Sequence, residues 1–498
     1  MNARVIFDRD GSYPHTFRGQ GSDIGFAGGL MGYLPDNPAI KEALSLAKEQ
    51  GRRIRFDSES LGAHHPNEAR IDIFNEEDGP AAMSVLTFST GGGSIRIDEM
   101  DGFPISYTGR RKMMYFAVRQ GAAADKIEHF ISENALPYQK RKPDPFLTTY
   151  HTNPAKDGEA AELYEITMPY GAEPAFPENL VNGPDVYYHR TADLVVPVPL
   201  RMKVEVPFCN AKGALDYSGE TGKSMAELAL IYECGLAEIN FEDARSRMKD
   251  VLSVMRKAIV APEKEKAAKN GVMEQWADSM KAAASERPLI DTGCIALSMH
   301  AAAAAMENSS AHNIVVAAPT CGSSGIIPAT VVAVGETMGL DDASLVEGLL
   351  ASGLIGSFIA NQATFGAEAA GCQAEVGSSC AMAAGGMVQL MGGSPIQGFR
   401  AAAIAMQSFM GLICDPVGGI AEIPCIARNI TASSVALTAA NMALCGFDPI
   451  IPLDETITTM FEVGQAIPDT LRCTCKGGLC TTPTGKRLDK LIRSKNQG

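Results

Sequence analysis

Three cysteines in glycine-rich phrases are the residues of this sequence best suited to do chemistry. Cys372 lies in Gly-Cys-Gln-Ala-Glu-Val-Gly, Cys414 in Cys-Asp-Pro-Val-Gly-Gly, and Cys425 in Pro-Cys-Ile-Ala-Arg-Asn. Cys414 follows Cys372 by 42 residues and Cys425 follows Cys414 by 11, so only the fold could collect the three thiols. Three thiolates without an obvious fourth suit an iron-sulfur cluster with one open iron, which can act as a Lewis acid. A structural zinc site would normally require four ligands in close Cys-x2-Cys pairs, which these phrases do not provide.

These phrases, in this order and at this spacing, resemble those of the iron-sulfur-dependent L-serine dehydratases, also called L-serine ammonia-lyases. The likeness extends to Ala318-Pro-Thr-Cys-Gly-Ser-Ser-Gly325, and nearer the N-terminus to Gly19-Gln-Gly-Ser-Asp23, His65-Pro-Asn67 and Gly91-Gly-Gly93. The resemblance implies that the three cysteines ligate a [4Fe-4S] cluster. It also implies a lyase that eliminates water and ammonia from a small 3-hydroxy amino acid, with L-serine giving pyruvate and ammonia.

The loop that follows Pro319 is the first segment expected beside the substrate. By resemblance, Thr320 would be catalytic and Gly322, Ser323 and Ser324 would bind substrate through backbone amides and hydroxyl groups. The alternative is a plain helix start after the proline, which the same residues would also support.

The second expected group comes from the N-terminal part of the chain. His65 would act in catalysis, because imidazole titrates near neutral pH, and Asn67 would bind substrate beside it. Gly91, Gly92 and Gly93 would let the backbone approach the substrate, or would only form a turn. Paired histidines in an exposed stretch, such as His64 and His65, are often only solvated surface residues. The alternative that His65 has no catalytic role therefore stays open.

The sequence also departs from the family pattern. A Ser-Ser-His-Thr type motif that precedes the glycine-rich segment in the family is missing, and Gln20 and Ser22 replace the family's His and Thr. His15 could compensate by position as a catalytic residue, and the base that removes the α-proton is left open. The alternative functions are therefore a lyase or desulfidase acting on another small substituted acid, and a non-catalytic, cluster-based sensor. The sequence shows no convincing lysine motif for a Schiff base, which argues against a dehydratase that depends on pyridoxal phosphate.

The segment Leu471-Arg-Cys-Thr-Cys-Lys-Gly-Gly-Leu-Cys480 brings further thiols close together in sequence. Cys473 or Cys475 is a further candidate metal ligand that could cap the open iron. The final 28 residues carry seven Lys or Arg against one Asp, so the alternative is a solvated basic tail.

The sequence patterns around these residues predict an α+β fold, with a small N-terminal α/β domain and a large all-α catalytic domain that together position them. Residues 1–108 should form the first domain. In it, strands at Val85–Ser89 and Ile95–Ile97 flank the glycine turn, and a helix covers Asn37–Lys48. Residues 109–215 contain ten prolines between Pro137 and Pro199, which predicts a long irregular connector with one or two helices.

Residues 216–498 should form the all-helical iron-sulfur domain with a cysteine-rich tail. Ser224-Met-Ala-Glu227 has the form of a capping box, and Gly235 is placed to end the helix that begins there. Beyond Ile290 the predicted helices are apolar on all sides, which is typical of a buried core or a subunit interface. Glycine-rich breaks are expected at 321–325, 385–386 and 418–419.

Composition narrows the class of partner. The 498 residues carry a net charge of −15, which argues against a nucleic-acid surface, and the apolar run 348–367 is borderline in length for a bilayer span. The N-terminus lacks the apolar stretch of a secretory signal, and twelve cysteines without such a signal suggest reduced thiols in the cytoplasm. We therefore expect a cytoplasmic homodimer acting on a small amino-acid-like molecule, with neither nucleic acid nor membrane as a partner.

Overall fold

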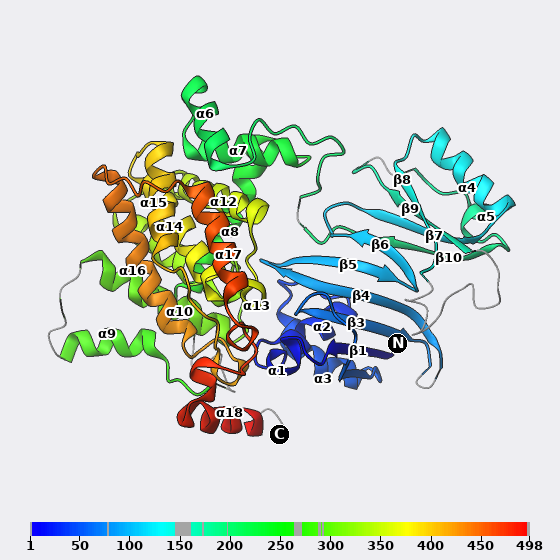
Figure 1. Cartoon of the computed structure of the whole chain (residues 1–498), viewed down its shortest axis with the longest axis horizontal. Coiled ribbons are helices and arrows are strands. Elements are labelled where there is room, and N and C mark those ends of the chain that lie inside the picture. Colours follow the sequence, from blue (N-terminus) through cyan, green and yellow to red (C-terminus); the bar gives the residue numbers. More distant parts are fainter. Residues whose placement is uncertain are drawn as a thin grey trace.

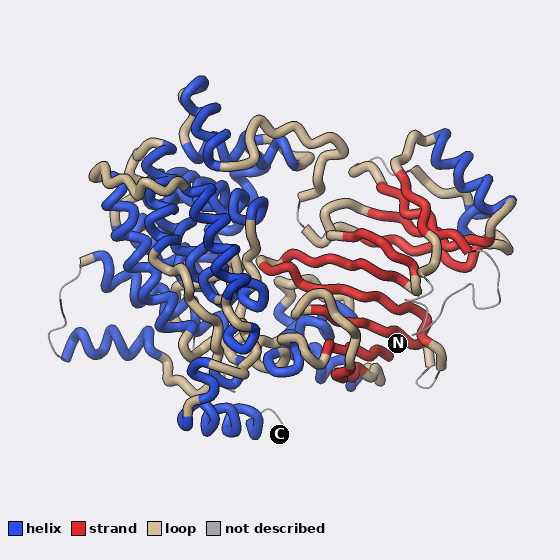
Figure 2. Tube along the Cα trace, in the orientation of Figure 1, coloured by secondary structure: helices blue, strands red, loops and turns tan. Residues whose placement is uncertain are grey.

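The structure, a computed structural model, describes residues 2–76, 79–144, 161–171, 174–196, 198–262, 271–286, 290 and 293–495. Strands occupy the N-terminal part and helices dominate from about residue 211 onward (Figures 1 and 2). The fold is therefore α+β, which confirms the fold class expected from the sequence.

The first sheet has six strands in the order β2-β1-β3-β4-β5-β6. Its strands are β1 (Asn2–Asp8), β2 (Ile54–Glu59), β3 (Glu68–Phe74), β4 (Ala81–Gly91), β5 (Ser94–Met100) and β6 (Phe103–Tyr107). Only β1 and β2 are parallel, with Val5 opposite Phe56, while Val5 lies opposite Ile71 of antiparallel β3. The accompanying helices are α1 (Tyr13–Thr16), α2 (Ser22–Leu30), the 3-10 helix η1 (Pro38–Glu42) and α3 (Ala43–Glu49). The predicted helix at 37–48 and the two strands around the glycine turn are thus confirmed.

The prediction of an irregular connector at 109–215 is wrong, because this region contains a second sheet in the order β10-β7-β9-β8, although the one or two helices expected there are present. Its elements are β7 (Met113–Arg119), α4 (Ala122–Glu133), β8 (Tyr138–Arg141), β9 (Ala161–Thr167), α5 (Glu178–Val181) and β10 (Val186–Ala192). This β-α-β-β-α-β sequence is the ferredoxin-like arrangement. None of the ten prolines lies within a described strand. A high density of prolines in the connecting segments therefore did not exclude strands between them.

The two sheets share a hydrophobic core. Val85 and Phe103 of the first sheet pack in one cluster with Tyr115 and Leu163 of the second. On another side of the second sheet, α4 buries Ile127 in a cluster with residues of β7 and β9. The sheets therefore form a continuous unit beside the helical region, as Figure 1 shows.

The helical region has α14 at its centre, with α12, α15 and α16 packed around it (Figure 1). Its α-helices are α6 (Ala211–Thr221), α7 (Met225–Leu236), α8 (Phe241–Ala258), α9 (Trp276–Glu286), α10 (Cys294–Ser310), α11 (Gly335–Thr337), α12 (Asp342–Gln362), α13 (Ala367–Ala370), α14 (Val376–Leu390), α15 (Pro395–Gln407), α16 (Cys425–Leu444), α17 (Leu453–Ala466) and α18 (Pro483–Lys495). The shorter helical segments are η3 (Cys321–Ser323), η4 (Pro328–Val334), η5 (Cys372–Ala374), η6 (Val417–Gly419), η7 (Asp469–Leu471) and η8 (Gly478–Thr481). The expected buried core beyond Ile290 is confirmed, since most of α14 is buried.

Two sequence predictions about glycines are corrected. The capping box of Ser224 and Glu227 is present, but α7 continues past Gly235 to Leu236. A Cβ at Gly235 would lie 2.4 Å from the carbonyl oxygen of Glu205, so this glycine permits a close approach. Similarly, α14 runs unbroken through Gly385 and Gly386, where a Cβ would meet α12 side chains at 2.1 and 2.2 Å. Gly385 and Gly386 therefore allow α12 to pack closely on α14.

Helix α12 is long and apolar enough to cross a membrane by length and composition, the only such helix among the described residues. The share of its apolar window that is buried inside the structure is 67%, and core helices pass the same test. This helix is therefore weak evidence for a membrane span, and its packing on α14 accounts for its composition.

Candidate active site

The three cysteines singled out from the sequence lie at or before the starts of helical segments. Cys372 begins η5 directly after Gly371, whose φ of +75° is unfavourable for other residues, and Cys425 begins α16. Cys414 lies in the segment between α15 and η6. All three side chains are buried, with exposed fractions of 2, 5 and 9% for Cys372, Cys414 and Cys425.

The fold brings the three thiols together, and this cluster of cysteine side chains is called the thiol group below. The thiols of Cys372 and Cys414 hydrogen-bond to each other. Burial is the largest cause that raises the pKa of Cys425, and charge repulsion from the nearby Cys372 sulfur raises it further. Among the described residues, no three His, Cys, Asp or Glu side chains surround a point where a single metal ion could bind. The arrangement therefore does not match a mononuclear zinc-type site.

The C-terminal segment adds Cys473 to this group. Its backbone N–H donates to the Cys414 carbonyl at 2.9 Å, and its thiol hydrogen-bonds to that of Cys414. Cys475 faces elsewhere, because its thiol contacts Cys480 and the Pro416 carbonyl. Of the two tail candidates, the structure thus places Cys473, and not Cys475, beside the other thiols.

The electrostatics of this thiol group favour a bound cation. The hydrogen bond with Cys414 and burial raise the pKa of Cys372, and burial raises that of Cys425. The charge of Arg428 lowers the pKa of Cys372 and Cys425, but its guanidinium donates to the Asp415 carboxylate at 2.9 Å and to the Ile413 carbonyl at 3.0 Å. Thiolates in this setting would need further positive charge, which is what a metal centre provides.

Sequence reasoning missed two half-buried carboxylates next to the thiols. Glu375 immediately precedes α14, accepts a hydrogen bond from the Thr320 hydroxyl, and has its pKa raised to about 7 by burial and by the charge of Glu368. A Cβ at Gly322 would lie 3.1 Å from the Glu375 Oε1 atom. A glycine at 322 therefore lets the Thr320 loop lie against this carboxylate.

Glu368 is the second carboxylate, and a residue from the sheet region contacts it. Burial raises the pKa of Glu368, while a hydrogen bond from the Asn67 side chain opposes that rise. Asn67 is buried and its Oδ1 atom accepts the Ser12 hydroxyl. The sequence contained a signal for both glutamates, since Glu368 and Glu375 stand in a stretch otherwise almost free of charge.

His65 lies on the sheet side of the same site. Its Nδ1 atom accepts the backbone N–H of Asn67 at 3.1 Å, and its ring stacks on Phe88 with centroids 4.8 Å apart. Burial lowers the pKa of His65, so the ring is neutral at neutral pH with its proton on Nε2.

A cavity of about 390 Å³ lies between the sheet and helical regions. His65 and Glu368 line it from opposite sides, and Arg472 contributes a cation. The full lining comprises Asp8, Asp10, Gly11, Ser12, Ala63, His64, His65, Pro66, Glu368, Ala369, Gln465, Asp469, Arg472 and Thr474. The Nε atom of Arg472 is buried without a hydrogen-bond partner in the described part of the chain.

The hydroxyl groups of the Thr320 loop are largely used within the loop. Ser323 and Ser324 are buried, and the Ser324 hydroxyl donates to the Cys321 carbonyl at 2.8 Å. Asn429 of α16 fixes the loop, because its amide donates to the Gly322 carbonyl at 2.8 Å and accepts the Gly325 N–H at 3.1 Å. Substrate binding by Gly322, Ser323 and Ser324 stays a prediction, with their backbone as the available part.

The turn of Gly91, Gly92 and Gly93 forms the tip of the β4–β5 hairpin, which points at the helical region in Figure 1. A Cβ at Gly91 would lie 2.7 Å from the backbone nitrogen of Gly366, and one at Gly92 would lie 2.8 Å from Phe365. Gly93 has no atom within 4 Å of such a Cβ. The turn thus abuts the segment that leads into α13 and Glu368.

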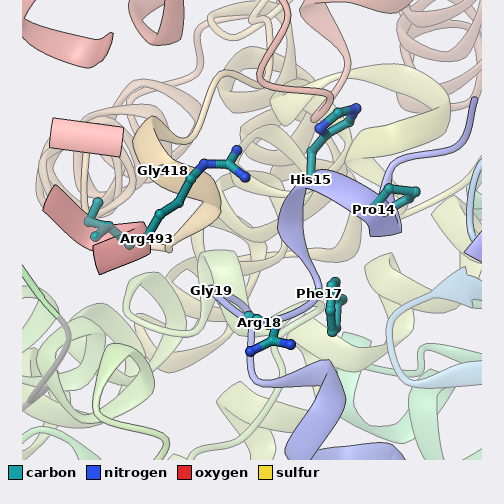
Figure 3. A pocket seen from close by; sticks show the side chains of 8 residues that line it. Pro14, His15, Phe17, Arg18, Gly19, Gly418 and Arg493 are labelled. Carbon is teal, nitrogen blue, oxygen red and sulfur yellow. The ribbon is translucent and has the colours of Figure 1, made fainter. Parts of the chain in front are cut away.

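His15 lies away from this cavity. It lines a second cavity of about 260 Å³ together with Arg18, Gly418 and Arg493, and Figure 3 shows these residues around it. Burial and the charges of Lys476 and Arg493 lower its pKa. Gln20, in contrast, reaches the thiol group, since its Nε2 atom lies 3.6 Å from the Cys473 sulfur.

Comparison with known proteins adds to this geometry. Residues 216–480 match the family model described as serine dehydratase alpha chain. The chain is 35% identical over 285 residues to a probable L-serine dehydratase alpha chain of Bacillus subtilis (strain 168), covering 57% of this chain and 95% of that protein.

Two further relatives give the same result. The L-serine dehydratase alpha chain of Peptoniphilus asaccharolyticus is 33% identical over 279 residues, which cover 56% of this chain and 96% of that protein. L-serine dehydratase 2 of Escherichia coli (strain K12) is 36% identical over 289 residues, which cover 56% of this chain and 62% of that protein. The matched family model spans more than half of the 498 residues and contains all the cysteines of the thiol group. The chain therefore belongs to the serine dehydratase alpha-chain family.

Proposed function

We propose that this protein is a lyase that removes water and ammonia from L-serine or a close 3-hydroxy amino acid, giving the keto acid and ammonia. The observation that carries the proposal is that the buried thiols lie close to Glu375, that Glu375 lies close to Glu368, and that Glu368 lines the cavity between the sheet and helical regions. The names of the relatives, which are L-serine dehydratases, support the choice of reaction and substrate.

We propose that Cys372, Cys414 and Cys425 hold a [4Fe-4S] cluster and that Cys473 occupies the remaining ligand position when no substrate is bound. The donor set fits this cofactor, because the thiols are buried, adjacent and short of positive charge, yet not grouped around a single ion. When bound, the cluster would supply a Lewis acid for the leaving hydroxyl group.

The protein's own residues provide opposite charges for the two ends of an amino acid. Arg472 lines the cavity, where its guanidinium also pairs with Asp469 and donates to the Ala369 carbonyl, and we assign this guanidinium to the substrate carboxylate. Glu368 lines the same cavity, and no cation is among the groups that shift its pKa. We assign Glu368 to the substrate ammonium group, with Asn67 orienting the carboxylate.

Glu375 is the proposed acceptor of the α-proton. Its pKa of about 7 makes it a base that is substantially ionised at neutral pH, yet basic enough to take a proton. The Thr320 hydroxyl donates to this carboxylate and would hold its orientation. His65 would act as a hydrogen-bond donor through Nε2, because Nδ1 is already occupied.

The oligomeric state, the location and the absence of other partners belong to the same proposal. We propose a cytoplasmic homodimer that binds neither nucleic acid nor membrane. The α16–α17 connection exposes three large apolar residues, Phe447, Ile450 and Ile451, at 50, 79 and 46%. Ile450 also adopts a φ of +66°, which is unusual for a β-branched residue and would be easier to maintain in an interface.

The test is anaerobic purification with iron and sulfide analysis, followed by a keto-acid and ammonia assay across 3-hydroxy and 3-thio amino acids. Oxygen-sensitive turnover of L-serine supports the proposal, while turnover of L-cysteine alone would identify a desulfidase. A bound cluster with no turnover of any of these compounds would contradict the lyase assignment and favour a sensor.

A further inference from the structure

A second pair of thiols lies in the C-terminal segment, beside the thiol group but separate from it. Cys475 and Cys480 both contact the carbonyl oxygen of Pro416, with sulfur-to-oxygen distances of 3.4 and 3.2 Å. The two side chains also hydrogen-bond to each other. Two sulfurs on one carbonyl oxygen, five positions apart in sequence, are placed for a covalent bond.

We propose that Cys475 and Cys480 form a reversible intramolecular disulfide by exchange with a low-molecular-weight disulfide. The Cys475 sulfur attacks the external disulfide, which forms a mixed disulfide and releases one thiol. The Cys480 sulfur, after losing its proton to solvent, then displaces the second thiol from Cys475. The protein loses two electrons and two protons, and the external disulfide becomes two thiols.

Exposure decides the order of these steps. Cys475 is half-buried, so an external disulfide can reach it, whereas Cys480 is buried with an exposed fraction of 7%. Cys475 is therefore the attacking residue and Cys480 the resolving one.

The disulfide would close a six-residue loop that is attached to the segment following Cys414. The Leu479 N–H donates to the Asp415 carboxylate at 2.8 Å, and Asp415 in turn pairs with Arg428 at 2.9 Å. In the dithiol form only noncovalent contacts such as these hold the loop. In the disulfide form the loop is covalently closed, which would keep Cys473 against Cys414 and so restrict access to the thiol group. This consequence for turnover rests on the proposed function, whereas the disulfide itself does not.

The first experiment reads the bond directly. The full chain is purified anaerobically, incubated with glutathione disulfide or with glutathione, alkylated and digested with trypsin. Cleavage after Arg472, Lys476 and Lys486 separates the two cysteines, so the disulfide appears as a cross-link between peptides 473–476 and 477–486. Fragmentation between Cys473 and Cys475 assigns the sulfur. A cross-link through Cys473, or full alkylation of both peptides after oxidation, would overturn the proposal.

Two variants and a control test the order of attack. Cys480→Ser should retain one glutathione on Cys475, and Cys475→Ser should leave Cys480 unmodified. Cys445→Ser removes an exposed cysteine at the end of α16 and should leave the cross-link unchanged. Equal modification of Cys480 with and without Cys475 would contradict the assigned order.

A turnover assay on the same samples separates the bond from its effect. Oxidation should lower the rate of keto-acid formation, and subsequent reduction should restore it, in the wild-type chain but not in Cys480→Ser. A cross-link that forms without any change in rate would leave the disulfide established and refute its role in holding the tail. Failure of the proposed activity would not affect the mass measurement.

Discussion

The helical side and the sheet side of the candidate active site hold their polar groups in different ways. On the helical side, Glu375 and Thr320 lie at the starts of segments that are embedded in the buried core around α14. On the sheet side, Ser12, His65 and Asn67 lie in loops next to β1 and β3 and hold each other by hydrogen bonds. The difference suggests that the helical side performs the chemistry, while the sheet side orients substrate and carboxylates.

The largest expected effect tests whether the chemistry belongs to the helical side. Cys414→Ser should lose bound iron and all turnover, because Cys414 contacts both Cys372 and Cys473. Iron content and keto-acid formation are the measurements. Cys445→Ser is the control, and iron content unchanged in Cys414→Ser would contradict the assignment.

The next largest effect tests the base. Glu375→Gln should lower kcat by about 10²- to 10⁴-fold with little change in KM, since general base catalysis contributes about that much. In the wild type, kcat/KM should rise as pH increases through about 7, where Glu375 loses its proton. The residual activity of the variant should lack this rise, and an unchanged pH profile would assign the base elsewhere.

A smaller effect is expected on the sheet side. Asn67→Ala removes the hydrogen bond to Glu368, which should raise KM about 10-fold, the size expected for losing a bond to a charged group. Steady-state kinetics separate this from a change in kcat. A fall in kcat as large as that of Glu375→Gln would end the distinction between the two sides.

Glu375 also predicts a pH dependence of stability in the metal-free chain. Its folded pKa of about 7 exceeds the ordinary value of 4.5, so its stabilising contribution is fully present below pH 4.5 and is lost as pH rises through 7. The loss amounts to about 3 kcal/mol. Urea unfolding of the wild type and Glu375→Gln across this range should diverge accordingly, and parallel curves would contradict the shift.

The smallest effect tests the contact between the two sides at the hairpin tip. Gly91→Ala and Gly93→Ala both place a side chain at positive φ, but only the first meets backbone atoms, at 2.7 Å. Gly91→Ala should therefore unfold more easily than Gly93→Ala by about 1 to 2 kcal/mol. Equal midpoints in urea would show that the tip does not press on the segment before α13.

Some parts of the fold follow from local sequence patterns and others do not. The capping box of Ser224 and Glu227 was located correctly, and α7 begins directly after Ser224. The second sheet was missed because proline density outweighed the strand-like runs at 113–119 and 161–167. Gly385 was interpreted as a helix break, whereas it allows α12 to approach α14, because a glycine in sequence does not reveal whether a neighbour lies beside it.

The sequence by itself determined the fold class, the family and the three phrases that carry Cys372, Cys414 and Cys425. Residue types and spacing were sufficient, because thiols in glycine-rich phrases restrict the possible chemistry. Only the tertiary structure decided that Cys473, and not Cys475, joins them, and that His15 lies in another cavity. It also brought Asn67 to Glu368 across 301 positions of the chain. Such contacts depend on how the sheet region packs against the helices, and no local pattern of residues encodes that geometry.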